Sequence, residues 1–215
     1  MDQHARVGRV LRLLLFSWLC SLLLAAALAV RIDARSSTLR RLDSSGELKS
    51  MSDRQVDDET RKAERLYQVS VLAQSLVLPP AKLCVGCLAV LGLCWFLRGR
   101  VKGRAVAPVA AAAMLPGSIA DLLDAVVAFR HAAIPPDGVA LVPRTLSAVT
   151  QVLGHALSGA WFRLGNVPDL FSFWAAVILA FGVASAGQLP PRHAVVTTLA
   201  AWLCYRLLTQ VALGG

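Results

Sequence analysis

Charged side chains are scarce in this 215-residue sequence, and several long stretches lack them altogether. Asp, Glu, Lys and Arg make up 16% of the residues, against about 25% in soluble domains. Residues 13–30, 145–162 and 170–191 contain none of the four. A soluble domain of this length cannot bury so many helices that are apolar on every side. The scarcity of charge therefore excludes an ordinary water-soluble fold.

Cysteine is absent from the places where a disulfide framework would need it. All five cysteines lie inside apolar segments and none lies in a hydrophilic loop: Cys20, Cys84, Cys87, Cys94 and Cys204. Cys84 and Cys87 have C-x-x-C spacing, but neither a second ligand pair nor a βαβ context accompanies them. Because residues three apart share a helix face, we interpret these two thiols as packing residues.

Motifs of enzymes and of nucleotide-binding proteins are missing as well. The sequence has no phosphate-binding loop and no dinucleotide fingerprint, and no Ser or Cys stands in a nucleophile context. His131, His155 and His193 do not have metal-ligand spacing. The net charge is +9, but the basic residues flank apolar segments without the interleaved aromatics of a nucleic-acid groove. We therefore predict a chain that is not an enzyme, holds no cofactor or metal and binds no nucleic acid.

Apolar segments long enough to cross a bilayer are abundant, since a spanning helix needs about 20 mostly apolar residues. There are six candidates: 10–30, 66–97, 105–128, 145–162, 169–187 and 194–212. The segment 145–162 is a short span, a re-entrant piece or an interfacial helix, because it contains the polar side chains of Ser147, Thr150, Gln151, His155 and Ser158. The predicted fold is an all-α, polytopic transmembrane helix bundle of five or six spans.

The composition divides the chain into three parts. Residues 1–30 resemble an uncleaved signal anchor, because three arginines precede an apolar run longer than that of a cleavable signal peptide. Residues 31–65 are hydrophilic, and we expect a flexible first half followed by a charged juxtamembrane helix from about residue 53. Residues 66–215 form the multi-span membrane domain.

The juxtamembrane helix has a recognisable start. Ser52 is followed three residues later by Gln55, the pattern of a capping box. Asp57 precedes Arg61 by four residues and Asp58 precedes Lys62 by four, so we expect two ion pairs along the helix. The helix is either a solvated extension of the next span or a docking surface for a partner.

Two features predict how the spans are built. The 32 residues of 66–97 would reach roughly 48 Å as a helix, against a hydrocarbon core of about 30 Å. Because Pro79 and Pro80 lie in the middle, this span is either kinked or begins above the membrane surface. Small residues recur every four positions in the segment 169–187, which predicts a seam for another helix: Ala176, Ala180 and Ala184.

The order of elements from about residue 50 to 215 is similar to that of bacterial members of the Yip1-domain family of five-span membrane proteins. The charged helix 51–65 leads into a long span and a short basic link. Leu115 and Pro116 resemble the family's Leu-Pro in its second span, and the entry to a later span resembles its Asp-hydrophobic-Phe…Trp pattern: Asp169, Leu170, Phe171 and Trp174.

The resemblance implies a non-enzymatic membrane protein with a cytoplasmic region before its first span. Eukaryotic members are associated with Golgi membranes and small GTPases, but no GTPase-contact residue transfers to this sequence. The segment 10–30 departs from the family pattern, which begins with a soluble region. Charge alone favours a cytoplasmic N-terminus, because Arg-rich flanks lie closest to the span ends there; the family would instead place 31–65 in the cytoplasm.

Ionisable residues inside spans are the best functional clue, because each costs about 2.5–3.5 kcal/mol on insertion scales. They are Asp121, Asp124, Lys82, Arg206 and, as a lone imidazole, His155. Asp121 and Asp124 share one helix face. They lie near the headgroups with the cations snorkelling, or form a buried ion pair with Lys82 or Arg206, or serve proton or ion transport.

The sequence thus favours an integral protein of a bacterial cytoplasmic membrane that acts as a scaffold or adaptor. Its expected partners are the lipid bilayer and other membrane proteins, which would contact 51–65 and the helix seams. Two alternatives remain open. The chain is a small transporter or channel subunit using Asp121, Asp124 and Lys82, or an accessory subunit of a larger membrane complex.

Overall fold

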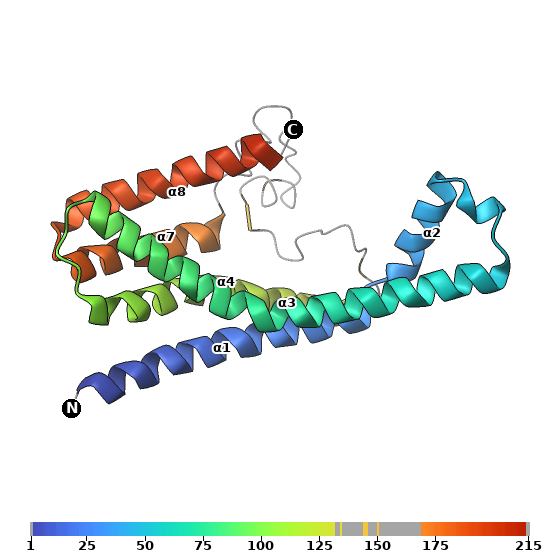
Figure 1. Ribbon diagram of the computed structural model, residues 1–215, viewed down its shortest axis with the longest axis horizontal. Coiled ribbons are helices and arrows are strands. Elements are labelled where there is room, and N and C mark those ends of the chain that lie inside the picture. Colours follow the sequence, from blue (N-terminus) through green and yellow to red (C-terminus); the bar gives the residue numbers. More distant parts are fainter. Residues whose placement is uncertain (1, 132–133, 135–143, 146–149, 151–168, 214–215) are drawn as a thin grey trace. The chain divides into compact units, whose positions relative to one another are not determined.

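The chain is mainly helical in the part that its structure, a computed structural model, describes: residues 2–131, 134, 144–145, 150 and 169–213. Figure 1 shows the helices, whose bounds are α1 Asp2–Arg31, α2 Ala34–Ser44, η1 Glu47–Lys49, α3 Asp53–Phe96, α4 Gly103–Arg130, α7 Leu170–Gly187 and α8 Pro191–Leu213. The all-α prediction is confirmed for these residues.

Four stretches of helix in the described residues are long and apolar enough to cross a membrane: Val7–Arg31, Asp53–Phe96, Gly103–Arg130 and Leu170–Gly187. They contain the predicted spans that start at residues 10, 66, 105 and 169, except for Leu97 at the end of the second and the capping residue Asp169 at the start of the last. α8 contains the predicted span 194–212 but is outside this set. The predicted segment 145–162 lies outside the described residues, apart from Thr145 and Thr150.

Large apolar side chains are exposed along all of the long helices. Trp95 is 81% exposed, Leu170 67% and Leu208 69%. A water-soluble protein rarely exposes apolar surface on this scale, whereas lipid-facing helices do so as a rule. The surface therefore agrees with integration into a membrane.

α3 is longer than the apolar span, which the sequence predicts either to be kinked or to begin above the membrane surface. It is one helix of 44 residues that begins at Asp53, inside the hydrophilic segment, and includes Pro79 and Pro80. At 1.5 Å per residue it is about 66 Å long, roughly twice the thickness of the hydrocarbon core. Its first turns therefore extend beyond the apolar span, as one of the two predicted alternatives requires.

The described chain forms two compact units. The first comprises residues 1–17, 79–120 and 143–215, and the second comprises 18–78 and 121–142. α1, α3 and α4 contribute residues to both.

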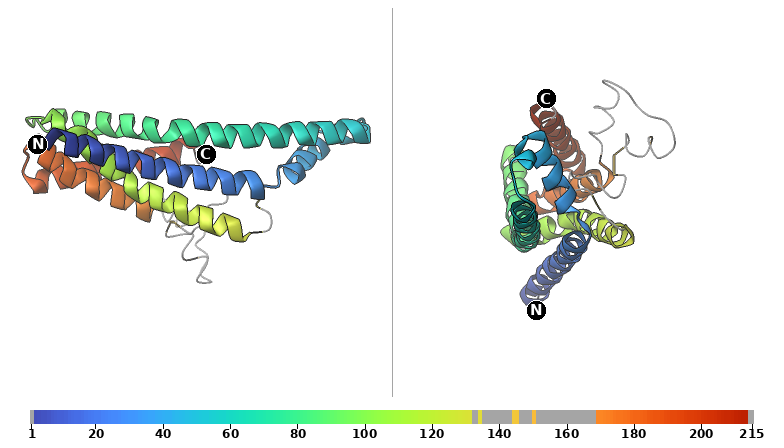
Figure 2. Two further views of the ribbon diagram at one scale, coloured as in Figure 1. Left: turned by 90° about the horizontal axis from the view of Figure 1, so that it is seen from below. Right: turned by 90° about the vertical axis from the view of Figure 1, so that its right-hand side faces the viewer.

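In the first unit, α7 and α8 form a hairpin that packs with the second part of α3 and the first part of α4 (Figures 1 and 2). The buried side chains of this core are mostly small: Val90, Cys94, Val106, Val183, Ala184, Ala186 and Ala194. The predicted seam is confirmed, since its three alanines are all buried. Cys87 packs against this core as predicted, but the prediction is wrong for Cys84, which is exposed.

Backbones approach closely in this unit because glycines face other helices. A Cβ on Gly182 of α7 would overlap the side chain of Val109 of α4. A Cβ on Gly86 of α3 would lie 3.1 Å from the Cβ of Ala110 of α4. Small residues at contacts are the usual means of packing helices in lipid, where burial of apolar surface gives little driving force.

In the second unit, α1 runs antiparallel to α3 and parallel to α4. The Trp18 indole donates to the Leu76 carbonyl over 2.9 Å, and the Gln68 amide donates to the Ala29 carbonyl over 3.3 Å. The core of this unit lies between α1 and the end of α4, and it includes Ala27, Ala125, Ala128 and Ile134. Figures 1 and 2 both show α1 beside α3.

The Trp18 contact supplies a hydrogen bond that α3 cannot make within itself. Pro80 has no backbone N–H, so the Leu76 carbonyl four residues earlier loses its helical donor. The Trp18 indole N–H occupies that position at 2.9 Å. An unsatisfied carbonyl in hydrocarbon costs several kcal/mol, so this bond stabilises a helix with two internal prolines.

The ends of α1 and α4 are satisfied in a similar way. The Phe129 carbonyl of α4 accepts from the Arg31 guanidinium over 3.3 Å. The Ile134 N–H donates to the Arg31 carbonyl, and the Asp33 N–H donates to the Ile134 carbonyl. The Phe129 and Arg31 carbonyls lie at helix ends, where no N–H of the same helix can reach them. A neighbouring chain segment supplies their donors.

We expect Gly182→Ala to lower the apparent Tm of the protein in mild detergent, because its Cβ overlaps Val109 and overpacking costs about 1–3 kcal/mol. Adding Val109→Ala should restore part of the loss. Gly92→Ala is the matched control, since nothing lies within 4 Å of its Cβ. Circular dichroism melting of the three variants and the wild type measures this, and equal Tm values for Gly182→Ala and Gly92→Ala would contradict the contact.

Candidate functional site

The hydrophilic segment folds into a helical structure that we call the charged hairpin: α2, η1 and residues 53–65 of α3. Figure 1 shows α2 rising at an angle from the end of α1, and α3 running back beneath it. An ion pair joins the two helices, with Arg35 Nη2 3.1 Å from Asp57 Oδ1. Thr38 and Leu42 lie four residues apart on α2 and are both buried, as is Thr60 on α3.

α2 corrects the expectation of a flexible first half for 31–65. The segment has no apolar periodicity, but Asp33 caps the helix by accepting from the Ser36 N–H over 3.0 Å. Asp is among the best N-cap residues because its carboxylate satisfies an orphan N–H. The Ser36 N–H, followed by the Ser36 hydroxyl, lowers the pKa of the Asp33 carboxyl below its ordinary value.

The predicted start of the second helix is confirmed. The Gln55 side chain accepts from the Ser52 N–H over 2.9 Å, as a capping box requires. The predicted ion pairs are wrong in their partners. Asp57 pairs with Arg35 of α2, and Lys62 pairs with Glu59 over 2.9 Å. Asp57 faces a tertiary neighbour, which spacing along one helix cannot reveal.

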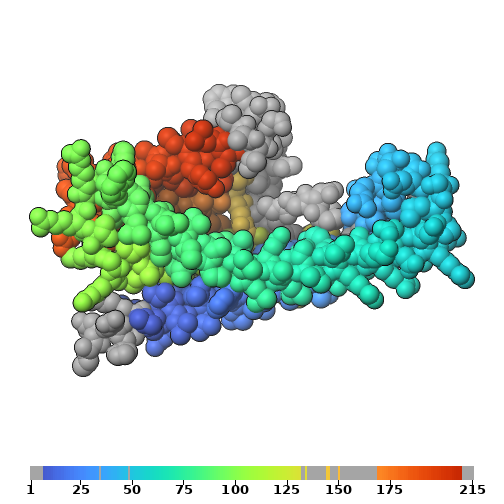
Figure 3. Space-filling view, in the orientation of Figure 1, coloured from blue at the N-terminus to red at the C-terminus, as the bar shows by residue number. Residues whose placement is uncertain are grey.

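Exposed charges cover the hairpin, whose surface Figure 3 shows in blue and cyan. One face of α3 carries three arginines, because Arg61 and Arg65 follow Arg54 by seven and eleven residues. All three are exposed. Nine basic and eight acidic residues occur in 31–65, so the surface is densely charged and nearly neutral.

The intramembrane carboxylates of α4 belong to the second unit. Asp121 Oδ2 accepts from the Ser21 hydroxyl of α1 over 3.4 Å. Asp124 is 8% exposed. A carboxylate in a span needs polar neighbours. For the half-buried Asp121, Ser21 is one that the sequence did not reveal because it lies a hundred residues away.

The other predicted polar residues are placed separately. Lys82 of α3 is exposed and Arg206 of α8 is half-buried, both in the first unit. Their pairing with the aspartates stays a prediction. His155 lies outside the described residues.

The family-like motif residues have identifiable structural roles. Asp169 caps α7, since its carboxylate accepts from the Phe171 N–H over 3.0 Å. Phe171 also receives the Arg144 guanidinium 5.9 Å above its ring. Leu170 and Trp174 are exposed, Leu115 is half-buried and Pro116 is fully buried inside α4.

No family model, curated protein or solved structure matches this chain. The resemblance to the Yip1-domain family therefore stays a prediction based on residue order and short motifs.

We expect the Asp33 cap to weaken in acid. Because the folded pKa is lowered, the carboxylate contributes its full stabilisation above the unfolded value of about 3.9 and loses it as pH falls through the folded value. Asp33→Ala should expose the α2 amides to exchange at neutral pH, at a cost of about 1 kcal/mol, and match the wild type in acid. Asp33→Asn keeps a neutral cap.

Hydrogen exchange of the α2 amides, corrected for the intrinsic rate at each pH, measures this. The start of α3 is an internal control because Ser52 and Gln55 cap it without titrating. Protection of α2 that is independent of pH in the wild type would show that the carboxylate does not hold this helix.

Proposed function

We propose that the chain is a non-enzymatic integral protein of the bacterial cytoplasmic membrane that acts as a scaffold or adaptor. In this proposal, residues from about 50 onward resemble the Yip1-domain family. The observation that carries it is the charged hairpin, an ordered pair of capped helices continuous with a membrane-crossing helix. A rigid polar surface beside the membrane suits contact with another protein, because little entropy is lost on binding.

We propose five spans, namely α1, α3, α4, α7 and α8. In the first unit the end of α3, the start of α4, the end of α7 and the start of α8 meet. Lys102 N–H donates to the Ala186 carbonyl over 2.8 Å, and Gly99 abuts Gly187. α4 runs away from this end and α7 returns to it, which supports a connection between them that begins and ends on one side.

This arrangement divides the basic residues between two sides. Nine in 31–65 and three from the last residue of α4 to the start of α7 fall on one side; three around the start of the first span, four in the α3–α4 link and Arg192 fall on the other. The first set is larger, but the second is denser and closest to the span ends, which favours the N-terminus in the cytoplasm. The family resemblance favours the opposite orientation.

Single cysteines test the span count and the orientation together. We expect Ser45→Cys, His131→Cys and Leu170→Cys to react with an impermeant maleimide from one side of sealed vesicles, and Arg192→Cys from the other. The wild type is the blank, because its cysteines lie in apolar helices. His131→Cys and Leu170→Cys reacting from opposite sides would mean that 145–162 crosses the membrane, and the five-span proposal would fail.

The adaptor role is tested by affinity purification of the full chain in mild detergent. A membrane-protein partner should co-purify with the wild type and be lost, by tenfold or more, from the variant Arg54→Glu/Arg61→Glu/Arg65→Glu. The matched control is Arg40→Glu/Arg41→Glu/Lys49→Glu, which changes the same charge at exposed positions of α2 and η1 and should retain the partner. Equal recovery from both variants would contradict a contact through α3.

A transporter or channel subunit is the second candidate, favoured by the burial of Asp124 and the Ser21–Asp121 contact inside spans. The purified protein in liposomes distinguishes it. Ion flux by the protein alone that Asp124→Asn abolishes would replace the adaptor proposal.

A further inference from the structure

The α3–α4 link carries four cations within seven residues: Arg98, Arg100, Lys102 and Arg104. All four are exposed, and Figure 3 shows this part of the chain, in green at the left edge, at the surface. Residues 79–120 and 170–213, which build this end of the first unit, contain no Asp or Glu. No carboxylate of these helices therefore neutralises the link, in contrast to the charged hairpin.

The link is held in one conformation by two helix ends. α3 and α7 both finish with a left-handed residue, Arg98 (φ 54°) and Gln188 (φ 53°). The next N–H closes each turn, from Gly99 to the Cys94 carbonyl and from Leu189 to the Ala184 carbonyl. Both turns follow the Schellman pattern, although neither has glycine at the left-handed position.

The two turns pack directly against each other. A Cβ on Gly99 would lie 2.8 Å from the Gly187 carbonyl oxygen and 3.1 Å from Leu189 Cδ1. The Lys102 N–H donates to the Ala186 carbonyl over 2.8 Å. The backbone that bears the cations is thus fixed to the α7–α8 turn rather than free to move.

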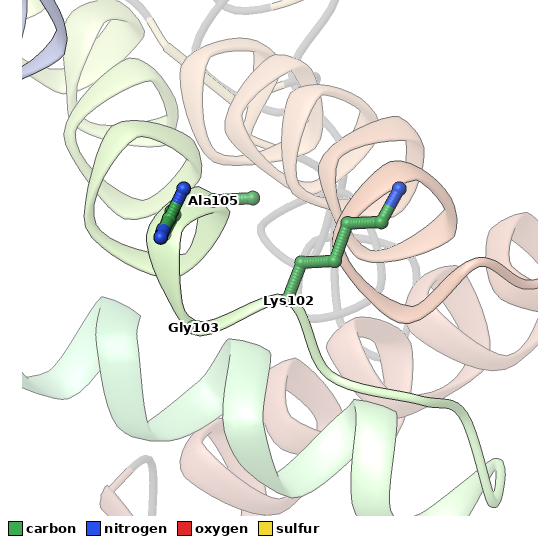
Figure 4. Close-up of a pocket in the computed structure, with 4 residues that line it drawn as sticks. Lys102, Gly103 and Ala105 are labelled. Atoms are coloured by element: carbon green, nitrogen blue, oxygen red, sulfur yellow. The ribbon is translucent and has the colours of Figure 1, made fainter. Parts of the chain in front are cut away.

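A cavity of about 400 Å³ opens at this link, lined by Lys102, Gly103, Arg104 and Ala105. Figure 4 shows the Lys102 side chain extended from the link beside Gly103. Exposed apolar side chains adjoin it along the chain, since Trp95, Phe96 and Val101 are all exposed. Cations next to exposed aromatic and aliphatic side chains are typical of the membrane interface.

We propose that the α3–α4 link is a binding site for the headgroup of an anionic phospholipid. The phosphodiester contacts Lys102 and Arg104 at the cavity, with Arg98 and Arg100 contributing to the attraction. The acyl chains lie along the exposed apolar residues that precede the link. A lipid fits better than a free phosphate because the cations stand at the ends of apolar helices with exposed hydrophobic neighbours. The site is independent of the proposed protein partner of the charged hairpin.

The test is native mass spectrometry of the full chain in detergent, titrated with phosphatidylglycerol, phosphatidylcholine or inorganic phosphate. We expect retention of phosphatidylglycerol over phosphatidylcholine. Lys102→Gln/Arg104→Gln should weaken phosphatidylglycerol binding by roughly 10- to 30-fold, since each cation near the surface contributes about fivefold. Arg192→Gln, which removes an exposed cation from the start of α8, should change binding much less.

Gly99→Ala separates a fixed site from diffuse attraction, because it leaves every charge in place while forcing the two turns apart. We expect it to weaken phosphatidylglycerol binding, whereas Gly92→Ala, in open space on α3, should not. If Gly99→Ala fails to fold, the Gln variants at exposed positions still decide the question. Equal retention of both lipids, an equal effect of Arg192→Gln, or displacement of the lipid by inorganic phosphate at matched concentration would overturn the proposal.

Discussion

The structure depends on one constraint: in hydrocarbon, every backbone N–H and C=O must find its partner within the protein. α3 cannot satisfy this constraint by itself, because Pro79 and Pro80 remove two backbone donors from the middle of a long helix. The Trp18 indole supplies one of them, at the Leu76 carbonyl. The same need joins the ends of α1 and α4, where the Arg31 side chain and the Ile134 backbone take up orphan groups. Several polar contacts between α1 and its neighbours thus supply hydrogen bonds that the neighbouring segment cannot make within itself.

Close packing does the work that the hydrophobic effect does in water. Burying a leucine against another helix gains little when the alternative neighbour is a lipid tail. The core of the first unit is accordingly built from alanine, valine, cysteine and glycine, which let helix axes approach. Gly182 against Val109 and Gly86 against Ala110 are examples of such contacts. Large side chains such as Trp95 and Leu170 are exposed instead, where lipid accommodates them at no cost.

Local features could be predicted from the sequence, and long-range ones could not. The four strongest apolar helices, the Ser52–Gln55 cap and the alanine seam follow from composition and spacing. α2 was missed because a short helix without apolar periodicity depends on its Asp33 cap and on Arg35 meeting Asp57. The partner of Asp57 was wrong for the same reason. Ser21 beside Asp121 and Gly99 against Gly187 join residues about 90 to 100 positions apart, a distance that periodicity cannot bridge.

The distribution of charge separates two surfaces of different chemistry. The charged hairpin mixes eight basic with seven acidic residues, and some of these charges already form internal pairs such as Arg35–Asp57. A surface of mixed sign discriminates among partners by pattern, which suits another protein. The α3–α4 link has four cations, and the segments 79–120 and 170–213 around it contain no carboxylate. A surface of uniform positive charge distinguishes binding partners only by the sign of their charge. A surface with repeated negative charges, such as an anionic leaflet, is complementary to it. The partner proposed for the charged hairpin and the lipid proposed for the link would therefore be recognised by different chemistry.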